Sequence, residues 1–242
     1  MSELNVVIGC VAIGGWYPRG VARMVNAFHE HSPGFTIKAW VNCLPPGAPE
    51  NVIVDGYDYT AYCAKPFAMK ALMDSGADIG ILLDAAFYPI RHIQPLVDHI
   101  AKQGYYLCDN GARVGEWSSD AALEALEADR ESLMKVTEVS SYCVGVDFSK
   151  VDGRSLVNSW CWNTSFRAIP GPHTSEQNFD GGRNCGFVSK DPRVKGHRHD
   201  QTVLSYRAWV LGLNKLSQRP YLTAYKGSED ERTVLLNQGM GS

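Results

Sequence analysis

Residues 80–89 read Gly80-Ile81-Leu82-Leu83-Asp84-Ala85-Ala86-Phe87-Tyr88-Pro89, a dense aliphatic run that stops at a carboxylate. Burying that charge without a partner would cost several kcal/mol, so the acid is expected at the end of a buried strand and not within the core. The strand is predicted over Ile79 to Leu83, with Asp84 directly after it. An acid in this place either faces a ligand or simply caps the following turn.

Predicted strands and helices alternate on both sides of this run. Buried strands are predicted over residues 4–13, 35–41, 79–83 and 105–108, and helices after Pro18 and over 61–75 and 90–102. This alternation predicts an α/β fold with parallel strands and helices on both faces of the sheet. Ligands bind such sheets outside the carboxyl ends of the strands, so Asp84 is expected where a small molecule is held.

The second half of the chain is less regular. A helix is predicted over residues 120–131, a strand over 142–148, a helical turn over 155–160 and a helix over 200–213. Between them, residues 169–196 are rich in glycine, proline and asparagine, and a loop of that length is usually functional.

Length and composition favour one domain spanning residues 1–242. The chain is 45% hydrophobic and 20% charged, which suits a sizeable core. No apolar run approaches the roughly 18 residues that span a bilayer, and the N-terminus lacks the basic start of a secretory signal. We therefore expect a cytoplasmic protein with no membrane partner. The seven cysteines form no C-x-x-C pair and are expected to be buried, reduced thiols.

The net charge of −3 provides no general basic surface for nucleic acid. A local basic strip remains, and its members are Arg183, Lys190, Arg193, Lys195 and Arg198. A solvated loop is the favoured interpretation of this strip, because runs of charge usually face water.

Two further clusters carry residues suited to chemistry. Gly196-His197-Arg198-His199-Asp200-Gln201 stands before a predicted helix and offers metal ligands and proton carriers, although Asp200 alone could be the helix N-cap. A hydrolase of the metallo-β-lactamase type would need a histidine where Gln201 stands. In Trp160-Cys161-Trp162-Asn163 the tryptophans either pack in the core or stack on a sugar.

The loop Gly14-Gly15-Trp16-Tyr17-Pro18-Arg19-Gly20 follows a predicted strand. It matches neither the dinucleotide fingerprint nor the phosphate-binding loop, so a dehydrogenase or a kinase has little support.

The stretch Tyr62-Cys63-Ala64-Lys65-Pro66, the following helix, the strand and Asp84-Ala85-Ala86 together resemble the centre of a GT-A-fold glycosyltransferase. The stretch from Gly196 to Ser205 is similar to the His-x-x-Asp-Gln-x-x-Leu-Ser motif late in several of these families. The resemblance covers roughly residues 4–213. It implies a Rossmann-like GT-A fold with a mostly parallel central sheet flanked by helices. The implied reaction moves a sugar from a nucleotide diphosphate donor, such as a UDP sugar, to an acceptor hydroxyl, usually with Mn²⁺ or Mg²⁺.

The resemblance also implies roles for single residues. Asp84 matches the first acid of the family's Asp-x-Asp motif, and Ala86 replaces the second acid. Asp84 and Asp200 are the implied catalytic residues, with Asp200 as general base toward the acceptor in an inverting displacement. The implied donor-binding residues are Lys65, Tyr62, Asp84, Ala86 and Arg198; the implied metal ligands are Asp84, His197 and His199; and the implied acceptor contacts are Trp160 and Trp162.

Several alternatives stay open at the level of sequence. Because Ala86 lacks a carboxylate, either a histidine of the His197/His199 pair completes a metal site, or Lys65 and Arg198 stabilise the leaving group instead. The long loop before His197 is a candidate lid over the donor. The acceptor is a glycan, a small metabolite, a protein side chain or a hydroxylated DNA base. The competing function is a non-catalytic nucleotide- or sugar-binding protein on the same fold.

Overall fold

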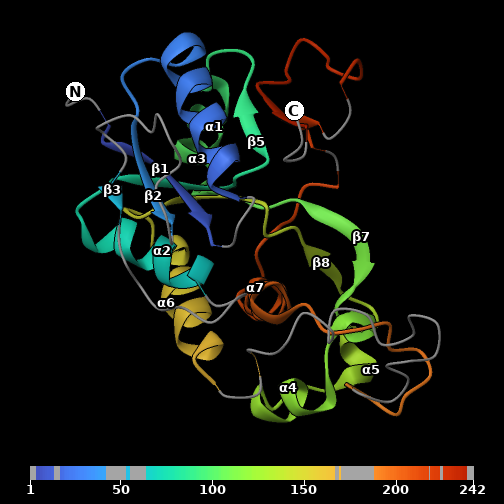
Figure 1. Cartoon of the computed structure of the whole chain (residues 1–242). Coiled ribbons are helices and arrows are strands. Elements are labelled where there is room, and N and C mark those ends of the chain that lie inside the picture. The colour runs from blue at the N-terminus through green and yellow to red at the C-terminus, as the bar shows by residue number, and fades with distance from the viewer. Residues whose placement is uncertain are drawn as a thin grey trace.

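The centre of the structure, a computed structural model, is a six-stranded sheet with the order β3-β2-β1-β4-β9-β6 (Figure 1). The structure describes residues 4–13, 17–41, 53–54, 64–166, 169, 188–217, 219–223 and 226–238. Four strands run parallel: β1 (Val6–Ala12), β2 (Thr36–Val41), β3 (Ile53–Val54) and β4 (Ile79–Asp84). β9 (Cys143–Asp147) is antiparallel both to β4 and to β6 (Tyr105–Tyr106). The predicted α/β class with a mostly parallel sheet is confirmed, and β9 makes the sheet mixed.

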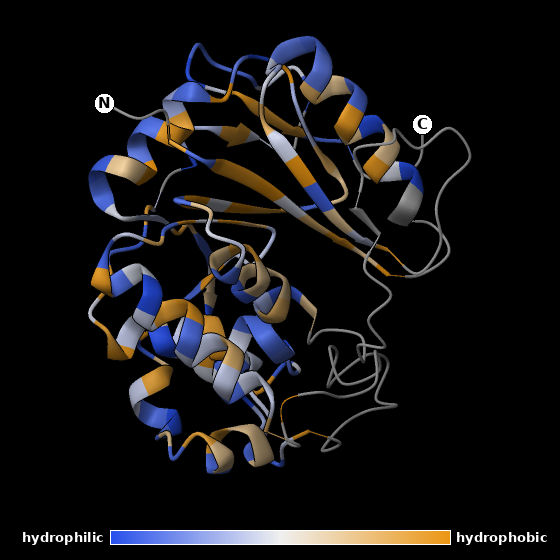
Figure 2. Cartoon of the chain, turned by 90° about the vertical axis from the view of Figure 1, so that its left-hand side faces the viewer, coloured by the Kyte–Doolittle hydropathy of each residue, from blue (hydrophilic) through white to orange (hydrophobic). Residues whose placement is uncertain are grey.

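Helices cover both faces of this sheet. α1 (Tyr17–His31) and α3 (Gln94–Gln103) lie on one face, and α2 (Ala64–Asp74) and α6 (Val151–Thr164) lie on the other (Figure 1). Successive strand residues point to opposite faces, so Ile8 joins the core under α1 while Val7 joins the core under α2. The second core also takes in α7 (His199–Val210). Figure 2 shows the hydrophobic strands enclosed between these helices.

The segment after Asp84 forms a second, smaller sheet. The predicted helix over residues 90–102 begins only at Gln94, because β5 (Phe87–Pro89) pairs with β11 (Leu235–Asn237). β11 also pairs with β10 (Leu222–Thr223). The C-terminal part of the chain therefore packs back on the segment that follows Asp84.

Between β6 and β9 the chain makes an excursion that sequence patterns did not resolve. It contains β7 (Asp109–Arg113), the 3₁₀ helix η1 (Val114–Trp117), α4 (Asp120–Ala125), α5 (Arg130–Leu133) and β8 (Thr137–Val139). The single helix predicted over residues 120–131 is wrong, because Glu127 takes a left-handed φ of 51° that ends α4. Asp129 then caps α5 by accepting from the Ser132 amide.

The helical turn predicted over residues 155–160 is in fact a helix of 14 residues. Gly153 weakens its sequence signal, but the packing requires glycine there: a Cβ atom would lie 2.4 Å from the Asp147 carbonyl oxygen. α6 therefore approaches β9 closely and carries Trp160 into the core.

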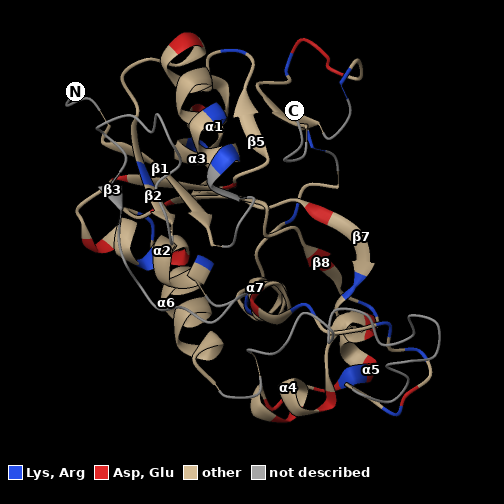
Figure 3. Ribbon diagram, viewed as in Figure 1, with Lys and Arg blue, Asp and Glu red and all other residues tan. Residues whose placement is uncertain are grey.

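Charged residues of both signs are interspersed along the described chain, mostly on helices and loops (Figure 3). In the predicted basic strip, Arg193 pairs with Glu131 and Asp191, Lys195 pairs with Glu116, and Arg198 pairs with Glu138. Three of its cations are thus partnered within the protein, and Arg183 lies outside the described residues. Within the described ranges no helix combines the length and the apolar character needed to cross a bilayer.

Candidate functional site

The residues singled out from the sequence meet at the carboxyl end of β4. Asp84 is the last residue of β4, and its amide donates to the Tyr142 carbonyl at 2.9 Å because antiparallel β9 begins at this edge. Lys65 lies in the first turn of α2 and Ser141 directly before Tyr142. This edge is where an open α/β sheet presents groups to a ligand.

The Lys65 ammonium is held by three oxygen atoms. Nζ lies 2.6 Å from Asp84 Oδ1, 3.2 Å from the Ser141 carbonyl oxygen and 3.3 Å from Ser141 Oγ. Burial alone would lower the pKa of Lys65, but the Asp84 and Asp200 carboxylates outweigh it and raise that pKa above the usual value. Lys65 therefore stays charged.

Asp200 contributes a second, more deeply buried carboxyl in the first turn of α7. It is 3% exposed, and within the described structure its Oδ2 has no hydrogen-bond partner. Burial raises the pKa of this carboxyl to about 7; Lys65 opposes the rise and Asp84 adds to it. Arg198, not Asp200, is the N-cap of α7, so the capping alternative for Asp200 does not hold. A carboxyl poised near neutrality is suited to proton transfer.

The two histidines of the cluster serve the fold of this region. His197 Nε2 donates to the Ile169 carbonyl at 3.0 Å, and its Nδ1 accepts from the Ser119 amide at 3.4 Å. His199 Nδ1 donates to the same Ile169 carbonyl at 2.9 Å. Burial, together with the adjacent His199, lowers the pKa of His197 to about 3, so that ring is neutral.

The residues of this edge do not fit a divalent cation. In the described parts of the chain no group of three or more His, Cys, Asp and Glu side chains is placed to hold a metal. Asp84 already faces the Lys65 ammonium, Ala86 offers no carboxylate, and both ring nitrogens of His197 are used. A cation beside Asp84 would therefore meet a positive charge and too few oxygen ligands.

Two of the remaining donor-binding candidates, Arg198 and Ala86, are hydrogen-bonded to other residues of the protein. Arg198 pairs with buried Glu138 at 2.7 Å, and its guanidinium stacks 3.8 Å above the Trp117 ring. The Ala86 carbonyl accepts from Arg23 Nη2 at 3.0 Å. Tyr62 lies outside the described residues, as does most of the segment predicted to be a lid.

The two tryptophans point in opposite directions from α6. Residues two apart on a helix differ by about 200° around its axis. Trp160 is fully buried and donates its indole N–H to the Asp200 carbonyl at 2.8 Å, whereas Trp162 is 70% exposed. Trp160 has no free face for a sugar, so the expectation that it binds the acceptor is wrong in this structure. For Trp162 that role stays a prediction.

Sequence reasoning missed three polar residues that surround the site. Ser141 touches Lys65, Gln201 touches Ser141, and Glu138 touches both Gln201 and Arg198. The available signal was an acid at position 138 in a short stretch that also carries Val136 and Val139.

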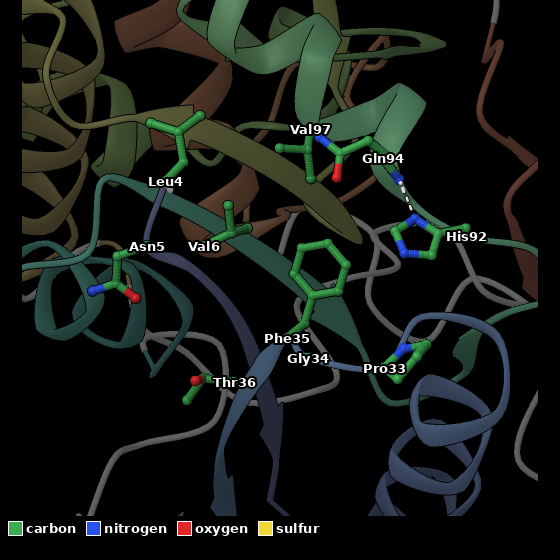
Figure 4. A pocket seen from close by; sticks show the side chains of 10 residues that line it. All are labelled: Leu4, Asn5, Val6, Pro33, Gly34, Phe35, Thr36, His92, Gln94 and Val97. Carbon is green, nitrogen blue, oxygen red and sulfur yellow. Dashed lines mark hydrogen bonds between the residues drawn. The ribbon is translucent and has the colours of Figure 1, made fainter. Parts of the chain in front are cut away.

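A hollow at another edge of the sheet differs from the Asp84 edge in the residues that line it. It lies at the opposite end of the parallel strands, where β1 and β2 begin, and Figure 4 shows Phe35 and His92 facing one another across it. Its lining is Leu4, Asn5, Val6, Pro33, Gly34, Phe35, Thr36, His92, Gln94 and Val97. None of these is an Asp, Glu, Lys or Arg, whereas the Asp84 edge gathers a lysine and two carboxyls.

Comparison with known proteins supports the fold. The chain is similar to a solved structure described as the WbbM bifunctional glycosyltransferase in its apo form, with a TM-score of 0.51 and 10% sequence identity. The likeness covers 91% of this chain and 40% of that one, so the chain spans less than half the length of that neighbour. No protein-family model and no curated protein sequence matches the chain. The fold is thus glycosyltransferase-like and Rossmann-like.

Proposed function

We propose that this protein is a glycosyltransferase that moves a sugar from a nucleotide diphosphate donor to an acceptor hydroxyl. The observation that carries the proposal is the juxtaposition of Lys65, Asp84 and Asp200 at the carboxyl end of β4, where the Asp200 Oδ2 has no hydrogen-bond partner in the described structure. The glycosyltransferase-like fold supports it, because such sheets bind nucleotides at this edge.

Lys65 is the proposed partner of the donor diphosphate. When the bond between the sugar C1 and the diphosphate oxygen breaks, negative charge grows on the leaving group, and a fixed ammonium nearby stabilises it. Asp84 orients Lys65 through the 2.6 Å contact and faces the ribose hydroxyls of the nucleotide. Because the described residues do not fit Mn²⁺ or Mg²⁺, we propose that Lys65 supplies the positive charge, with Arg198 as the second candidate cation.

Asp200 is the proposed general base. Its ionised carboxylate takes the proton of the acceptor hydroxyl as the acceptor oxygen bonds to C1 and the nucleoside diphosphate leaves. With a pKa of about 7, close to half of the Asp200 carboxyls are ionised at neutral pH. The acceptor itself is a glycan, a metabolite, a protein side chain or a hydroxylated base.

A thermal-shift screen against nucleotide diphosphate sugars tests the donor, since a ligand that binds only the folded state raises the melting temperature. Each sugar is tested with Mn²⁺ and with a chelator. We expect stabilisation by one donor in both conditions. Failure of all nucleotide sugars to stabilise the protein would refute the proposal, and stabilisation only with Mn²⁺ would refute the role of Lys65.

Turnover separates an enzyme from a binding protein. We expect slow donor hydrolysis by the wild-type protein and its loss in Asp84→Asn. The matched control is Asp74→Asn, which removes the acid of the exposed Lys70–Asp74 pair on the same helix as Lys65 and should leave hydrolysis unchanged. Donor binding without any hydrolysis or transfer would favour the non-catalytic alternative. The absence of the second acid of the Asp-x-Asp motif, where Ala86 stands, also favours that alternative.

A further inference from the structure

Glu138 is a fully buried carboxylate whose role the proposed reaction does not explain. It lies on β8, its side chain is 0% exposed, and its Oε2 accepts three hydrogen bonds. The donors are Arg198 Nη1 at 2.7 Å, Asn110 Nδ2 at 3.1 Å and Gln201 Nε2 at 3.3 Å. Its Oε1 is buried without a hydrogen-bond partner in the described structure. Such a group is costly to bury, so an arrangement that keeps it points to a specific use.

One of these bonds begins a chain that ends at Lys65. Because Glu138 takes the Gln201 amide protons, Gln201 must turn Oε1 toward Ser141. That oxygen accepts from both the Ser141 amide and the Ser141 hydroxyl, each at 3.2 Å. With its proton directed to Gln201, Ser141 Oγ presents a lone pair to Lys65 Nζ at 3.3 Å. Every donor and acceptor along this relay is thus fixed by the one before it.

The same carboxylate also fixes the second cation. The side chain of Arg198 is 30% exposed, and its guanidinium contacts both Glu138 and the Trp117 ring. Glu138 is therefore connected to both cations assigned to the donor. It reaches Lys65 through a chain of three hydrogen bonds and contacts Arg198 directly.

We propose that Glu138 is a positioning residue that sets the Lys65 ammonium and the Arg198 guanidinium in the geometry that receives the donor diphosphate. The inference rests on the proposed function for the identity of the ligand, and on the hydrogen-bond relay for the positioning. Being fully buried, Glu138 does not touch the donor; its influence passes through Gln201, Ser141 and Arg198.

Steady-state kinetics on four variants tests this role. Burial raises the pKa of Glu138 to about 7, against the pull of Arg198. Glu138→Gln keeps the size of the side chain but cannot ionise, and Ser141→Ala cuts the relay next to Lys65 while leaving Glu138 in place. We expect each to raise the donor KM and to lower kcat, together reducing kcat/KM about tenfold, because Lys65 holds the bound diphosphate and also stabilises the charge that grows on it as the bond breaks. The double variant should be little worse than the poorer single variant, since residues of one network are not additive. Asn110→Ala, which removes a bond to Glu138 outside the relay, should stay within about twofold of wild type.

Lysine side-chain NMR provides a readout that does not need the donor. With the Lys65 signal assigned by Lys65→Arg, we expect Glu138→Gln to shift it in the same direction as Ser141→Ala, while Asn110→Ala leaves it in place. An unmoved Lys65 signal in Glu138→Gln, or kcat/KM effects that multiply in the double variant, would overturn the relay. If the wild-type protein binds no nucleotide sugar although the signal responds, the proposed function and the donor part of this inference fail while the positioning of Lys65 stands.

Discussion

Replacing Asp200 with asparagine is expected to stabilise the protein at alkaline pH while abolishing its proposed activity. Burial raises the pKa of the Asp200 carboxyl from 3.8 to about 7 in the folded protein, against the pull of Lys65. A carboxyl whose pKa is higher in the folded than in the unfolded state holds its proton more tightly when folded, so its ionisation destabilises the fold. Asparagine has nearly the same size and cannot ionise.

The magnitude follows from the two pKa values. Each pKa unit corresponds to about 1.36 kcal/mol. The rise from 3.8 to about 7 is therefore worth about 4 kcal/mol. This contribution to wild-type stability is lost progressively as the pH rises from 3.8 to about 7 and stays lost above it. The free energy of unfolding of Asp200→Asn should thus exceed that of wild type by up to about 4 kcal/mol near pH 8, and by almost nothing near pH 4.

Urea unfolding followed by tryptophan fluorescence at about pH 4, 6 and 8 measures this difference directly. Asp74→Asn is the control, because Asp74 is 58% exposed in its pair with Lys70 and its replacement should change the free energy of unfolding by less than about 1 kcal/mol. An Asp200→Asn protein that is less stable than wild type near pH 8, or whose difference from wild type does not grow with pH, would refute the assignment of Asp200 as a strained, buried acid.

Three further outcomes are expected. Among the described cysteines, Cys161 should be alkylated first, because it is only partly buried. The other three thiols are fully buried, which encloses them and raises their pKa values; they are Cys10, Cys108 and Cys143. Mass spectrometry after brief labelling would show the order of alkylation. Trp160→Phe should lower the free energy of unfolding by about 1 to 2 kcal/mol through loss of the bond to the Asp200 carbonyl, and an unchanged urea midpoint would contradict that bond. Glu127→Gly should raise stability by up to about 1 kcal/mol, measured by thermal unfolding, because glycine adopts the φ of 51° without strain.

The fold was largely predictable because the local pattern of apolar residues indicates which side chains are buried. The aliphatic run before Asp84 and the helical spacing after Pro18 report only on which residues face the core, and that suffices to place parallel strands between helices. The local pattern of apolar residues does not indicate the direction of a strand. β9 reads as an apolar strand whichever way it runs, and its antiparallel pairing with β4 depends on the excursion that precedes it.

The residues of the candidate site also differ in whether local sequence patterns could predict them. Asp84 and Asp200 could be predicted because each stands at the end of a predicted strand or helix, whereas Lys65 was predicted only from the resemblance to GT-A-fold glycosyltransferases. Glu138 could not, since its partners Asn110 and Gln201 come from distant parts of the chain and only the folded structure brings them together. The tryptophans show a third case: once α6 is known to be a continuous helix, Trp160 shares a face with the apolar residues Leu156 and Val157, and Trp162 points away from that face.

The pairing of β5 with β11 has a consequence for the order in which the protein can be completed during synthesis. The segment directly after Asp84 leaves the ribosome long before Leu235–Asn237, its antiparallel partner. Arg91 makes the same connection, since its Nη1 donates to the Thr233 carbonyl at 2.9 Å. A nascent chain can therefore assemble its parallel strands early, whereas the small sheet of β5, β10 and β11 is complete only after the last described strand has been made.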